Sequence, residues 1–485
     1  MKRAAIAIVG LVILLAGIVL VRTINFTPSE NQTAEPSALK VDRDRVAQHL
    51  SEAIQFKTVS KQKPSRPNPE AFEGFINWFE KAYPEVHGAT TRELINYTIL
   101  LKWEGSDPDA QPVLLTGHYD VVPVIPGTES IWKQPPYSGN IVDGYVWGRG
   151  ALDDKSAAIA IMEAATLLVK QGFQPKQTVY LSFGHDEEVS GKDGADRVAA
   201  HLKKQGIQLE WSLDEGSFVI NGMMPGIDKP VASINVAEKG YTTLRLIASG
   251  AGGHSSMPPS RTAVGELAEA ITKLQSAPFK GGVDGIVGDM LNQLGRHMTF
   301  STRMAIANQW LFGWMVESQF GGSTAGNAMM RTTIAPTMLS GSIKENVLPI
   351  RATATVNFRI HPRDSVDGVV EHVRQAIQND NIEIKVLGGN EASNIADIQS
   401  RSYAAIEKTA RQIFPDAVIA PGLTVAATDS RYYGKVSDNA YRFNPMIVGP
   451  GDLATFHGTN EKISIDNLEK ATVFYAQLLL NVNAY

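Results

Sequence analysis

The sequence predicts an α/β fold in which a mostly parallel sheet is covered by helices. Short apolar segments that are typical of buried strands alternate with amphipathic helical segments from residue 41 onward. This alternation favours parallel strands that are joined by crossover helices. The 485 residues, 43% of them hydrophobic, are enough to form two or three domains with sizeable cores.

The N-terminal segment predicts a transmembrane anchor. Residues 4–21 carry no charge, and a helix of this length is about 27 Å long, which just spans the core of a bilayer. Lys2 and Arg3 favour a cytoplasmic N-terminus, with the rest of the chain on the non-cytoplasmic side. The alternative is a cleaved signal peptide and a secreted protein, but the apolar segment is longer than usual and lacks a clear cleavage site. Residues 22–40 are polar, contain two prolines and predict a tether.

Residues 41–237 predict the first part of the main domain. The apolar residues of 112–124 and 177–184 predict strands, and the Ala/Leu/Met-rich residues 156–172 predict a helix that ends at a glycine. In an open parallel sheet, functional groups gather at the carboxyl ends of the strands. Polar clusters follow three of the predicted strands here, with the sequences GHYD, HDEE and DEGS.

The pattern changes after residue 237 and predicts a second, α+β domain inserted at 238–390. Residues 276–330, rich in Gly, Met and Trp, predict helical segments and a long loop. Residues 391–485 then return to the main domain with two amphipathic helices. Within the insert we expect strands at 239–250, 351–362 and 381–389 and helices from about 263 and at 366–378.

Composition excludes several classes of partner and site. The net charge of −5 and the absence of a Lys/Arg run make nucleic acid an unsuitable partner. The chain has no cysteine, so it has neither disulfides nor thiolate ligands. Any metal must therefore be held by histidines and carboxylates, which suit Zn²⁺, Mn²⁺ or Co²⁺.

Residues 185–188, His-Asp-Glu-Glu, place three carboxylates side by side after an apolar strand. Like charges repel each other, and burial penalises each of them. A cation among the carboxylates would offset both costs, so the segment indicates a metal site.

Five polar clusters contain residues that can bind a metal or move a proton. Each has an ordinary explanation: a hydrogen-bonded histidine near a turn, an N-cap aspartate, an exposed neighbour such as Glu215, or a surface histidine. Together, however, two imidazoles and several carboxylates around one sheet match a two-metal hydrolytic centre with a bridging carboxylate and a bridging water. The residues are His118 and Asp120, Asp153 and Asp154, Glu187 and Glu188, Asp214, and His457.

Motifs over residues 45–480 occur in an order that resembles a known family. They are GHYDVVPV, GRGALDDKSA, DEEVSG, GAGGHSSMPP, VNFRIHP, TDSRYY and FHGTNEKI. The chain is similar to the dinuclear zinc metallopeptidase family of Gly-X carboxypeptidases, aminoacylases, carnosinase-type dipeptidases and acetylornithine/succinyl-diaminopimelate deacylases. Within this family it is most similar to the branch of Gly-X carboxypeptidases and N-fatty-acyl-amino-acid hydrolases.

The resemblance implies a zinc-exopeptidase-like main domain with two metal ions and a set of ligands for each. His118, Asp153 and Asp214 are expected to bind one ion. Asp153, Glu188 and His457 are expected to bind the other, with Asp153 as the bridge. Zinc is the metal that the family implies, although Mn²⁺ or Co²⁺ would accept the same ligands.

The resemblance also implies how the neighbouring residues act. Asp120 would orient His118 through its ring N–H, and Glu187 would be the general base that takes a proton from the bridging water. Asp154 would remain outside the ligand set.

The inserted domain is expected to act as a lid and as a dimerisation domain. In the resembling enzymes the equivalent of His254, often supplied by the partner subunit, stabilises the oxyanion, and this implies a homodimer. Asn346 and Arg359 match positions that grip the substrate carboxylate; the alternative for Arg359 is a surface ion pair. Ser430 and Arg431 are candidates for the same pocket.

These features predict a membrane-anchored two-zinc hydrolase that cleaves the amide bond next to a free carboxylate. The substrate would be a peptide or an N-acyl amino acid, and the sequence leaves this choice open. The alternative function is a non-catalytic, membrane-held binding protein of the same family. Such relatives usually lack ligands, whereas every expected ligand and the base are present here.

Overall fold

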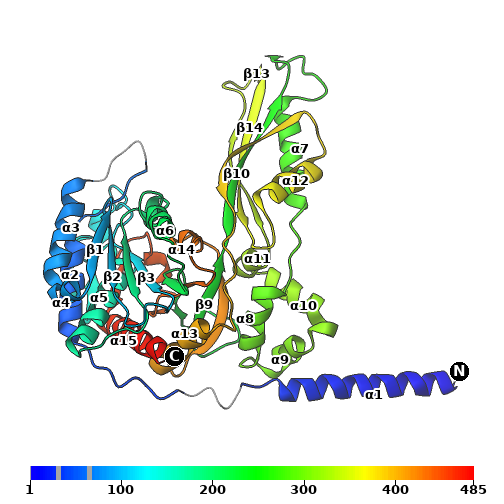
Figure 1. Cartoon of the computed structure of the whole chain (residues 1–485). Helices are drawn as coiled ribbons and strands as arrows, with labels where there is room; N and C mark the ends of the chain where they lie inside the picture. The colour runs from blue at the N-terminus through cyan, green and yellow to red at the C-terminus, as the bar shows by residue number, and fades with distance from the viewer. Residues whose placement is uncertain (1, 29–33, 63–67, 485) are drawn as a thin grey trace.

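The computed structural model of the protein describes residues 2–28, 34–62 and 68–484 (Figure 1). A large sheet and its covering helices form the main domain, and a second sheet extends away from it. Helix α1 (Lys2–Asn25) projects from the molecule.

The large sheet is mixed, so the prediction of a mostly parallel sheet is not confirmed. Its centre, β6–β3–β7–β17, is parallel, but β1–β2, β2–β6, β17–β9 and β8–β9 are antiparallel. At one edge the cause is a tight turn in which Asn96 has a φ of 56°, a backbone conformation that asparagine tolerates. In order across the sheet, the strands are β1 (Thr91–Ile95), β2 (Thr98–Trp103), β6 (Val179–Gly184), β3 (Val113–His118), β7 (Trp211–Asp214), β17 (Ala440–Arg442), β9 (Val231–Glu238), β8 (Val219–Ile220) and β18 (Ile447–Val448), and β16 (Val418–Thr424) also pairs with β9.

Alternate residues of the central strands face two separate cores. Leu101 and Leu115 belong to the larger core, whereas Leu100 and Leu114 belong to a smaller core. This is the two-residue period of strands that are buried on both faces. The larger core includes α2 (Arg43–Gln55), α3 (Pro69–Ala82), α4 (Pro84–Ala89), α5 (Lys155–Lys170), α13 (Arg401–Ile413) and α15 (Ile465–Asn483), and the smaller one includes α6 (Ala195–Lys204) and α14 (Ser430–Tyr433).

The second sheet is antiparallel and follows directly on the first, because Lys239 alone separates β9 from β10. Its strand order is β12–β14–β10–β15, and the apolar residues of its strands pack with α7 and α12 in a core of their own. A small two-stranded ribbon, β11–β13, lies at the end far from the main domain (Figure 1). The elements are β10 (Gly240–Ser249), β11 (Gly253–His254), α7 (Ala263–Ser276), β12 (Thr333–Ser340), β13 (Val347–Leu348), β14 (Arg351–Ile360), α12 (Val366–Ile377) and β15 (Ile382–Asn390).

Residues 285–330 form four helices. Helix α8 packs against β16, and apolar residues of the helices share a third core with Val231 and Val418 of the large sheet. The segment therefore belongs as much to the main domain as to the second sheet. Its helices are α8 (Gly285–Gly295), α9 (Phe300–Ala307), α10 (Gln309–Gly321) and α11 (Thr324–Met330).

A small sheet brings the C-terminal segment beside the start of α5. Strand β19 (Lys462–Ser464) pairs with β5 (Tyr145–Trp147), which also pairs with β4 (Ile141–Val142). The loop before β19 consequently lies next to the loop after β5, where Gly148 donates its N–H to the Glu461 carbonyl at 2.9 Å. The chain also has short 3₁₀ helices at Glu129–Ile131, Glu187–Val189 and Leu453–Thr455.

Helix α1 is long and apolar enough to cross a membrane, and most of its side chains are exposed. A signal sequence has the same properties, so the helix is a candidate anchor or a candidate signal. Among the residues of α1, only Val19 and Thr23 are buried.

Candidate metal centre

A cleft of about 1710 Å³ opens between the large sheet and the second sheet. One side includes acidic residues and two histidines from loops of the main domain, and the other side comes from β10 and β14. The main-domain residues include Asp153, Glu187, Glu188, Glu215 and His457, and the second sheet supplies Tyr241, Asn357 and Arg359.

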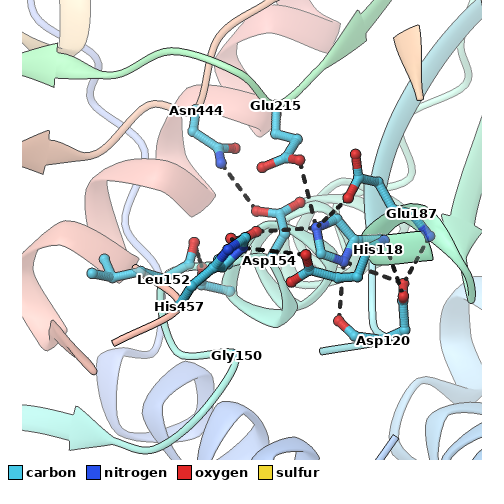
Figure 2. Close-up of polar contacts among 12 residues, drawn as sticks. His118, Asp120, Gly150, Leu152, Asp154, Glu187, Glu215, Asn444 and His457 are labelled. Atoms are coloured by element: carbon cyan, nitrogen blue, oxygen red, sulfur yellow. Dashed lines mark hydrogen bonds and ion pairs between the residues drawn. The ribbon is translucent and has the colours of Figure 1, made fainter. Parts of the chain in front are cut away.

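His118 ends the fully buried strand β3 and is fixed by Asp120 (Figure 2). Its Nδ1 lies 3.0 Å from the Asp120 backbone carbonyl and 3.4 Å from the Asp120 carboxylate. The ring nitrogen that faces Asp120 is thus the donor, and Nε2 is left to face the acidic residues. Burial alone would lower the pKa of His118, but hydrogen bonds with Asp120, Asp153 and Glu215 raise it well above its usual value.

Asp120 also fixes the two adjacent glutamates. Its two carboxylate oxygens accept the backbone N–H groups of Glu187 and Glu188, each at 3.2 Å. The two glutamates begin a 3₁₀ turn that follows the end of β6 after two residues. One buried carboxylate therefore orients both the histidine and the acidic pair.

Asp153 lies between two imidazoles. Its Oδ1 is 3.1 Å from Nε2 of His118, and its Oδ2 is 3.0 Å from Nε2 of His457. Although burial opposes ionisation, hydrogen bonds with both histidines lower the pKa of Asp153. His457 is also 3.2 Å from Glu188, and its hydrogen bonds to Asp153 and Glu188 raise the pKa of His457 to about 10.

Glu215 lies beside His118, so the ordinary explanation of Glu215 as an exposed neighbour of Asp214 is not observed. Its side chain is only 12% exposed, and its Oε1 is 3.5 Å from His118 Nε2. Burial and the nearby Asp153 raise the pKa of Glu215 to about 7.

Asp214, which precedes Glu215 at the end of β7, is arranged differently. Its Oδ1 accepts the backbone N–H of Glu215 at 2.9 Å, and its buried Oδ2 has no hydrogen-bond partner among the described residues. Consecutive residues of a strand point to opposite faces. The expected ligand Asp214 accordingly does not join the described groups of candidate ligand atoms, and Glu215 does.

Asp154 lies closer to the acidic cluster than expected. It occupies the N-cap position of α5 but makes no capping hydrogen bond. Its Oδ1 accepts a hydrogen bond from Asn444 at 3.0 Å (Figure 2), and its buried Oδ2 has no partner among the described residues. Burial and the nearby Glu215 raise the pKa of Asp154 well above its usual value.

Two groups of potential ligand atoms meet at His118. Within each group the atoms lie within 4.8 Å of one another. One group is His118, Asp153 and Glu188, and the other is His118, Asp154 and Glu215. Nitrogen and oxygen donors at this spacing fit a divalent ion such as Zn²⁺, and the buried carboxylate oxygens of Asp154 and Glu188, which have no hydrogen-bond partner among the described residues, are free to bind one.

A buried ion pair supports the loop that bears Asp153, and sequence reasoning missed it. Glu461 accepts a hydrogen bond from Arg149 at 2.6 Å. Its other oxygen accepts the backbone N–H groups of Gly150, Leu152 and Asp153 at 3.0, 2.8 and 3.2 Å. The only signal in the sequence is that Glu461 lies four residues after His457, in the same motif.

Arg359 reaches the cleft from β14, where it pairs in register with Tyr241 of β10. It is exposed and forms no ion pair with any residue that the structure describes, so the alternative of a surface ion pair is not observed. Ser430 does not line the cleft, because it starts α14 with its hydroxyl buried. Its neighbours Thr428 and Arg431 line the cleft instead.

The structure does not bring His254 and Asn346 to the cleft of their own chain. His254 is exposed on the β11–β13 ribbon, where its Nδ1 accepts the N–H of Ser256 at 3.1 Å. Asn346 lies beside it, and its carbonyl accepts the N–H of Ser255 at 3.2 Å. Neither side chain lines the cleft, and the ribbon is at the far end of the second sheet (Figure 1).

Comparison with known proteins finds the same family along most of the chain. Residues 114–481 match the model of peptidase family M20/M25/M40. The chain is 37% identical to the mouse N-fatty-acyl-amino acid synthase/hydrolase PM20D1, over 92% of this chain and 89% of the mouse protein. It is 30% identical to carboxypeptidase S of Saccharomyces cerevisiae, over 91% of this chain and 85% of the yeast protein.

Solved structures show the same fold at low identity. The M20 family metallo-carboxypeptidase Sso-CP2 from Sulfolobus solfataricus superposes with a TM-score of 0.65 at 19% identity, covering 91% of this chain and 99% of that one. Human carnosine dipeptidase 1 superposes with a TM-score of 0.61 at 17% identity, covering 91% and 97%.

Proposed function

The chain belongs to peptidase family M20/M25/M40, and from this premise we propose that it is a two-metal hydrolase that cleaves the amide bond next to a free carboxylate. The observation that carries the proposal is Asp153, whose two oxygens each contact one imidazole, from His118 and His457. A carboxylate between two histidines is the arrangement that a bridging ligand requires. The relatives are named as hydrolases and carboxypeptidases, which supports an enzyme.

The residues that would hold the metals are assigned from their contacts with His118 and His457 and from the bridging role that the family resemblance implies for Asp153. One ion would be held by His118, Asp153 and Glu215, and the other by Asp153, Glu188 and His457. Asp154, which shares a group of ligand atoms with His118 and Glu215, stays outside the proposed ligand set, as the resemblance implies. We place Glu215 where the family resemblance implies Asp214, because Glu215 contacts His118. A divalent pair, with zinc as the expected metal, would polarise the substrate carbonyl and make a bound water acidic.

Glu187 is the proposed general base. It lines the cleft, its carboxylate is 3.9 Å from His118, and it belongs to neither group of ligand atoms. Burial raises the pKa of Glu187 well above its usual value, with a further contribution from Glu215. A carboxylate with a raised pKa can accept a proton from water and return it to the leaving amine. Asp120 is the positioning residue, since it holds His118 and the Glu187 backbone together.

Arg359 is the proposed site for the substrate carboxylate. Its guanidinium is exposed at the cleft without an anionic partner among the described residues, and a planar fork of donors suits a carboxylate. We further propose that His254 and Asn346 complete the cleft of a partner subunit, so that the second sheet acts as a dimerisation domain. Their position at the exposed tip, away from the cleft of their own chain, supports this arrangement.

The proposed setting is a membrane that α1 crosses, with the body on the non-cytoplasmic side. The exposed apolar side chains of α1 and the leading Lys2 and Arg3 support an anchor. Secretion after signal cleavage is the alternative that α1 also allows. The substrate class remains a peptide or an N-acyl amino acid, as the names of the relatives suggest.

The test combines metal analysis with a substrate panel. We expect two equivalents of metal per chain, and loss of hydrolysis after chelation with recovery on adding Zn²⁺. The Glu187→Gln variant should keep its metal and lose turnover by about 10²- to 10⁴-fold. Dipeptides and N-acyl amino acids should be cleaved, whereas the same compounds with an amidated carboxylate should not.

One conservative variant completes the test. Arg359→Lys keeps the charge but not the fork, and it should raise KM more than it lowers kcat. Wild-type turnover in Glu187→Gln would reject the base assignment, and a chain without bound metal would reject the hydrolase itself.

A further inference from the structure

Helix α10 consists largely of apolar residues, as a buried helix does, yet several of its side chains are exposed at the surface. Its sequence, QWLFGWMVESQFG, is apolar on all sides, yet Val316 is its only buried residue. Trp314 is 73% exposed and Trp310 is 54% exposed, and the two are one helical turn apart on the same side. A helix that is apolar all round normally lies in an apolar environment. The part of the chain that the structure describes supplies one on a single side only, where Val316 lies in the third core with Phe312 and Phe320 packed against it.

Helix α9, which packs against α10, also exposes apolar side chains. Phe300 at the start of α9 is 48% exposed, and Met315 of α10 is also exposed. We call Phe300, Trp310, Trp314 and Met315 the α9–α10 surface. Exposed apolar groups that gather on neighbouring helices mark a contact with a membrane or another molecule.

Contacts with α1 indicate that a membrane, rather than another molecule, covers the α9–α10 surface. The Arg22 guanidinium donates to the Ala307 carbonyl at 3.2 and 3.1 Å. The Asn308 side chain, between α9 and α10, donates to the Val19 carbonyl at 3.3 Å and to the Thr23 hydroxyl at 3.2 Å. Val19 and Thr23 are the two buried residues of α1. The junction of α9 and α10 is therefore fixed against the last turns of α1 (Figure 1).

The position of these contacts along α1 sets the depth of the surface. Val19 lies two residues before the end of the apolar segment 4–21, or about 3 Å along the helix axis. If α1 crosses a bilayer, this level is the boundary between hydrocarbon and headgroups. Tryptophan is the side chain that prefers this boundary.

Basic residues next to the surface fit the same boundary. The Arg303 guanidinium lies 5.8 Å from the centre of the Phe300 ring, and that of Arg296 lies 4.6 Å from the Phe26 ring just beyond α1. Guanidinium groups beside exposed aromatic rings suit anionic headgroups over an apolar layer. Glu317 is the only acidic residue of α10.

We propose that the α9–α10 surface lies in the headgroup layer of the bilayer that α1 crosses, as a second, interfacial attachment of the main domain. The inference rests on the proposed membrane setting of α1. Its occupant is a lipid surface rather than a second copy of the chain, because hydrogen bonds fix the junction of the two helices to the last turns of the helix that would span the bilayer. The attachment would hold the main domain in a fixed orientation on the membrane instead of on a free tether.

The absence of cysteine allows a direct test on the full chain. Single cysteines at Trp314, at Ile13 in the middle of α1, and at Leu94 on β1, at the other edge of the large sheet, would each bear one environment-sensitive fluorophore. Each labelled protein is placed in vesicles of phosphatidylcholine and phosphatidylglycerol. Quenching by nitroxide lipids of different depths is compared with quenching by aqueous iodide, and turnover of a soluble substrate reports that each variant is folded.

We expect the label at 13 to be quenched by deep lipid nitroxides, the label at 314 by shallow ones, and the label at 94 by iodide alone. If deep lipid nitroxides quench the label at 13 but iodide alone quenches the label at 314, the proposed interfacial attachment is wrong and the proposed anchor stands. Labels at 13 and 314 both in water would reject the anchor and the surface together. A label at 314 that is shielded from both quenchers would assign the surface to a second copy of the chain and also overturn the proposal.

Discussion

At the scale of single residues, the cleft depends on which of two adjacent carboxylates faces His118. Asp214 ends β7 and accepts the N–H of Glu215, while the Glu215 carboxylate reaches to 3.5 Å from the imidazole. The sequence shows both acids but not the direction in which either points. That direction follows from the last pleat of the strand, which depends on the neighbours β3 and β17.

The two carboxylates can be separated by isosteric substitution. We expect Glu215→Gln to lower the metal content by about one equivalent per chain, because the proposed site loses a carboxylate that would bind the ion directly. Turnover should fall by at least about 10²-fold. Asp214→Asn, the matched control, should bind both ions and lose less activity. Elemental analysis of both purified variants decides the assignment, and the opposite result would return the ligand role to Asp214.

Much of the site was predictable at this scale because residue type limits the chemistry. Without cysteine, only histidines and carboxylates can hold a metal, and they gather in a few motifs. What could not be predicted depends on non-local contacts, as with Glu461, which joins residue 461 to the loop at 150–153. Ser430 illustrates the reverse case: its motif lies at the cleft, but the turn of α14 directs Arg431 to the cleft and leaves the Ser430 hydroxyl buried.

At the scale of elements, the connection between the two sheets is a narrow hinge. Lys239 lies between β9 and β10, and its buried ammonium nitrogen donates to the carbonyls of Ala328 and Arg331, both at 2.9 Å. Gly240 permits the close approach of the returning chain, since a Cβ there would lie 2.5 Å from the Asn390 carbonyl oxygen. The segment that leaves the main domain at Lys239 and the segment that returns to it after Asn390 therefore run side by side.

The contribution of Lys239 to the free energy of unfolding depends on pH. Burial, together with the nearby Arg359, lowers the pKa of Lys239 to about 7. At pH values between about 7 and the ordinary lysine pKa of 10.5, Lys239 is protonated in the unfolded chain and neutral in the folded chain. The contribution of Lys239 to stability is consequently smallest below pH 7 and rises with pH, by at most about 1.4 kcal/mol per pH unit.

Substitution of this lysine exposes the effect. We expect Lys239→Met to be less stable than the wild type, because two carbonyls lose their donor, and the difference in melting temperature should widen between pH 6.5 and pH 9.5. Thermal melts of the two proteins at both values are the measurement. A difference that stays constant would show that the folded chain keeps Lys239 charged up to the higher pH, as the unfolded chain does, and a difference that narrows would show that folding raises the pKa of Lys239 instead of lowering it.

Element boundaries and element pairing differ in how far a sequence determines them. The helix predicted at 156–172 is observed at Lys155–Lys170, and the strand predicted at 177–184 at Val179–Gly184, because local periodicity and capping fix both. The mixed character of the large sheet was missed. Pairing between β17 and β9, which are far apart in the chain, depends on tertiary contacts that no local pattern records.

At the scale of the whole molecule, one chain does not bring together all the residues that we assign to catalysis. His254 lies on the ribbon at the tip of the second sheet, far from the acidic cluster of its own main domain. A two-fold dimer through the second sheet would exchange these tips between subunits. The homodimer prediction therefore implies that each cleft receives His254 from the other subunit.

Mixed dimers test that statement. His254→Ala and Glu187→Gln should each be nearly inactive alone, but after dissociation and random reassociation the mixture should regain about one quarter of wild-type turnover. In the mixed dimer, the subunit with an intact Glu187 receives its histidine from the other. No recovery, with mixed dimers verified by differently tagged subunits, would place His254 in its own chain's cleft or outside the reaction.

The wide spacing of the metal-site residues along the chain also bears on biosynthesis. His118 and Asp153 leave the ribosome some three hundred residues before His457, and the whole second sheet is translated between them. A growing chain can form most of the central sheet early, but it lacks the imidazole on the far side of Asp153 and the Glu461 carboxylate that steadies its loop. In the proposed two-metal site, metal loading would thus wait for the last few dozen residues, and a partly made chain would carry an incomplete centre.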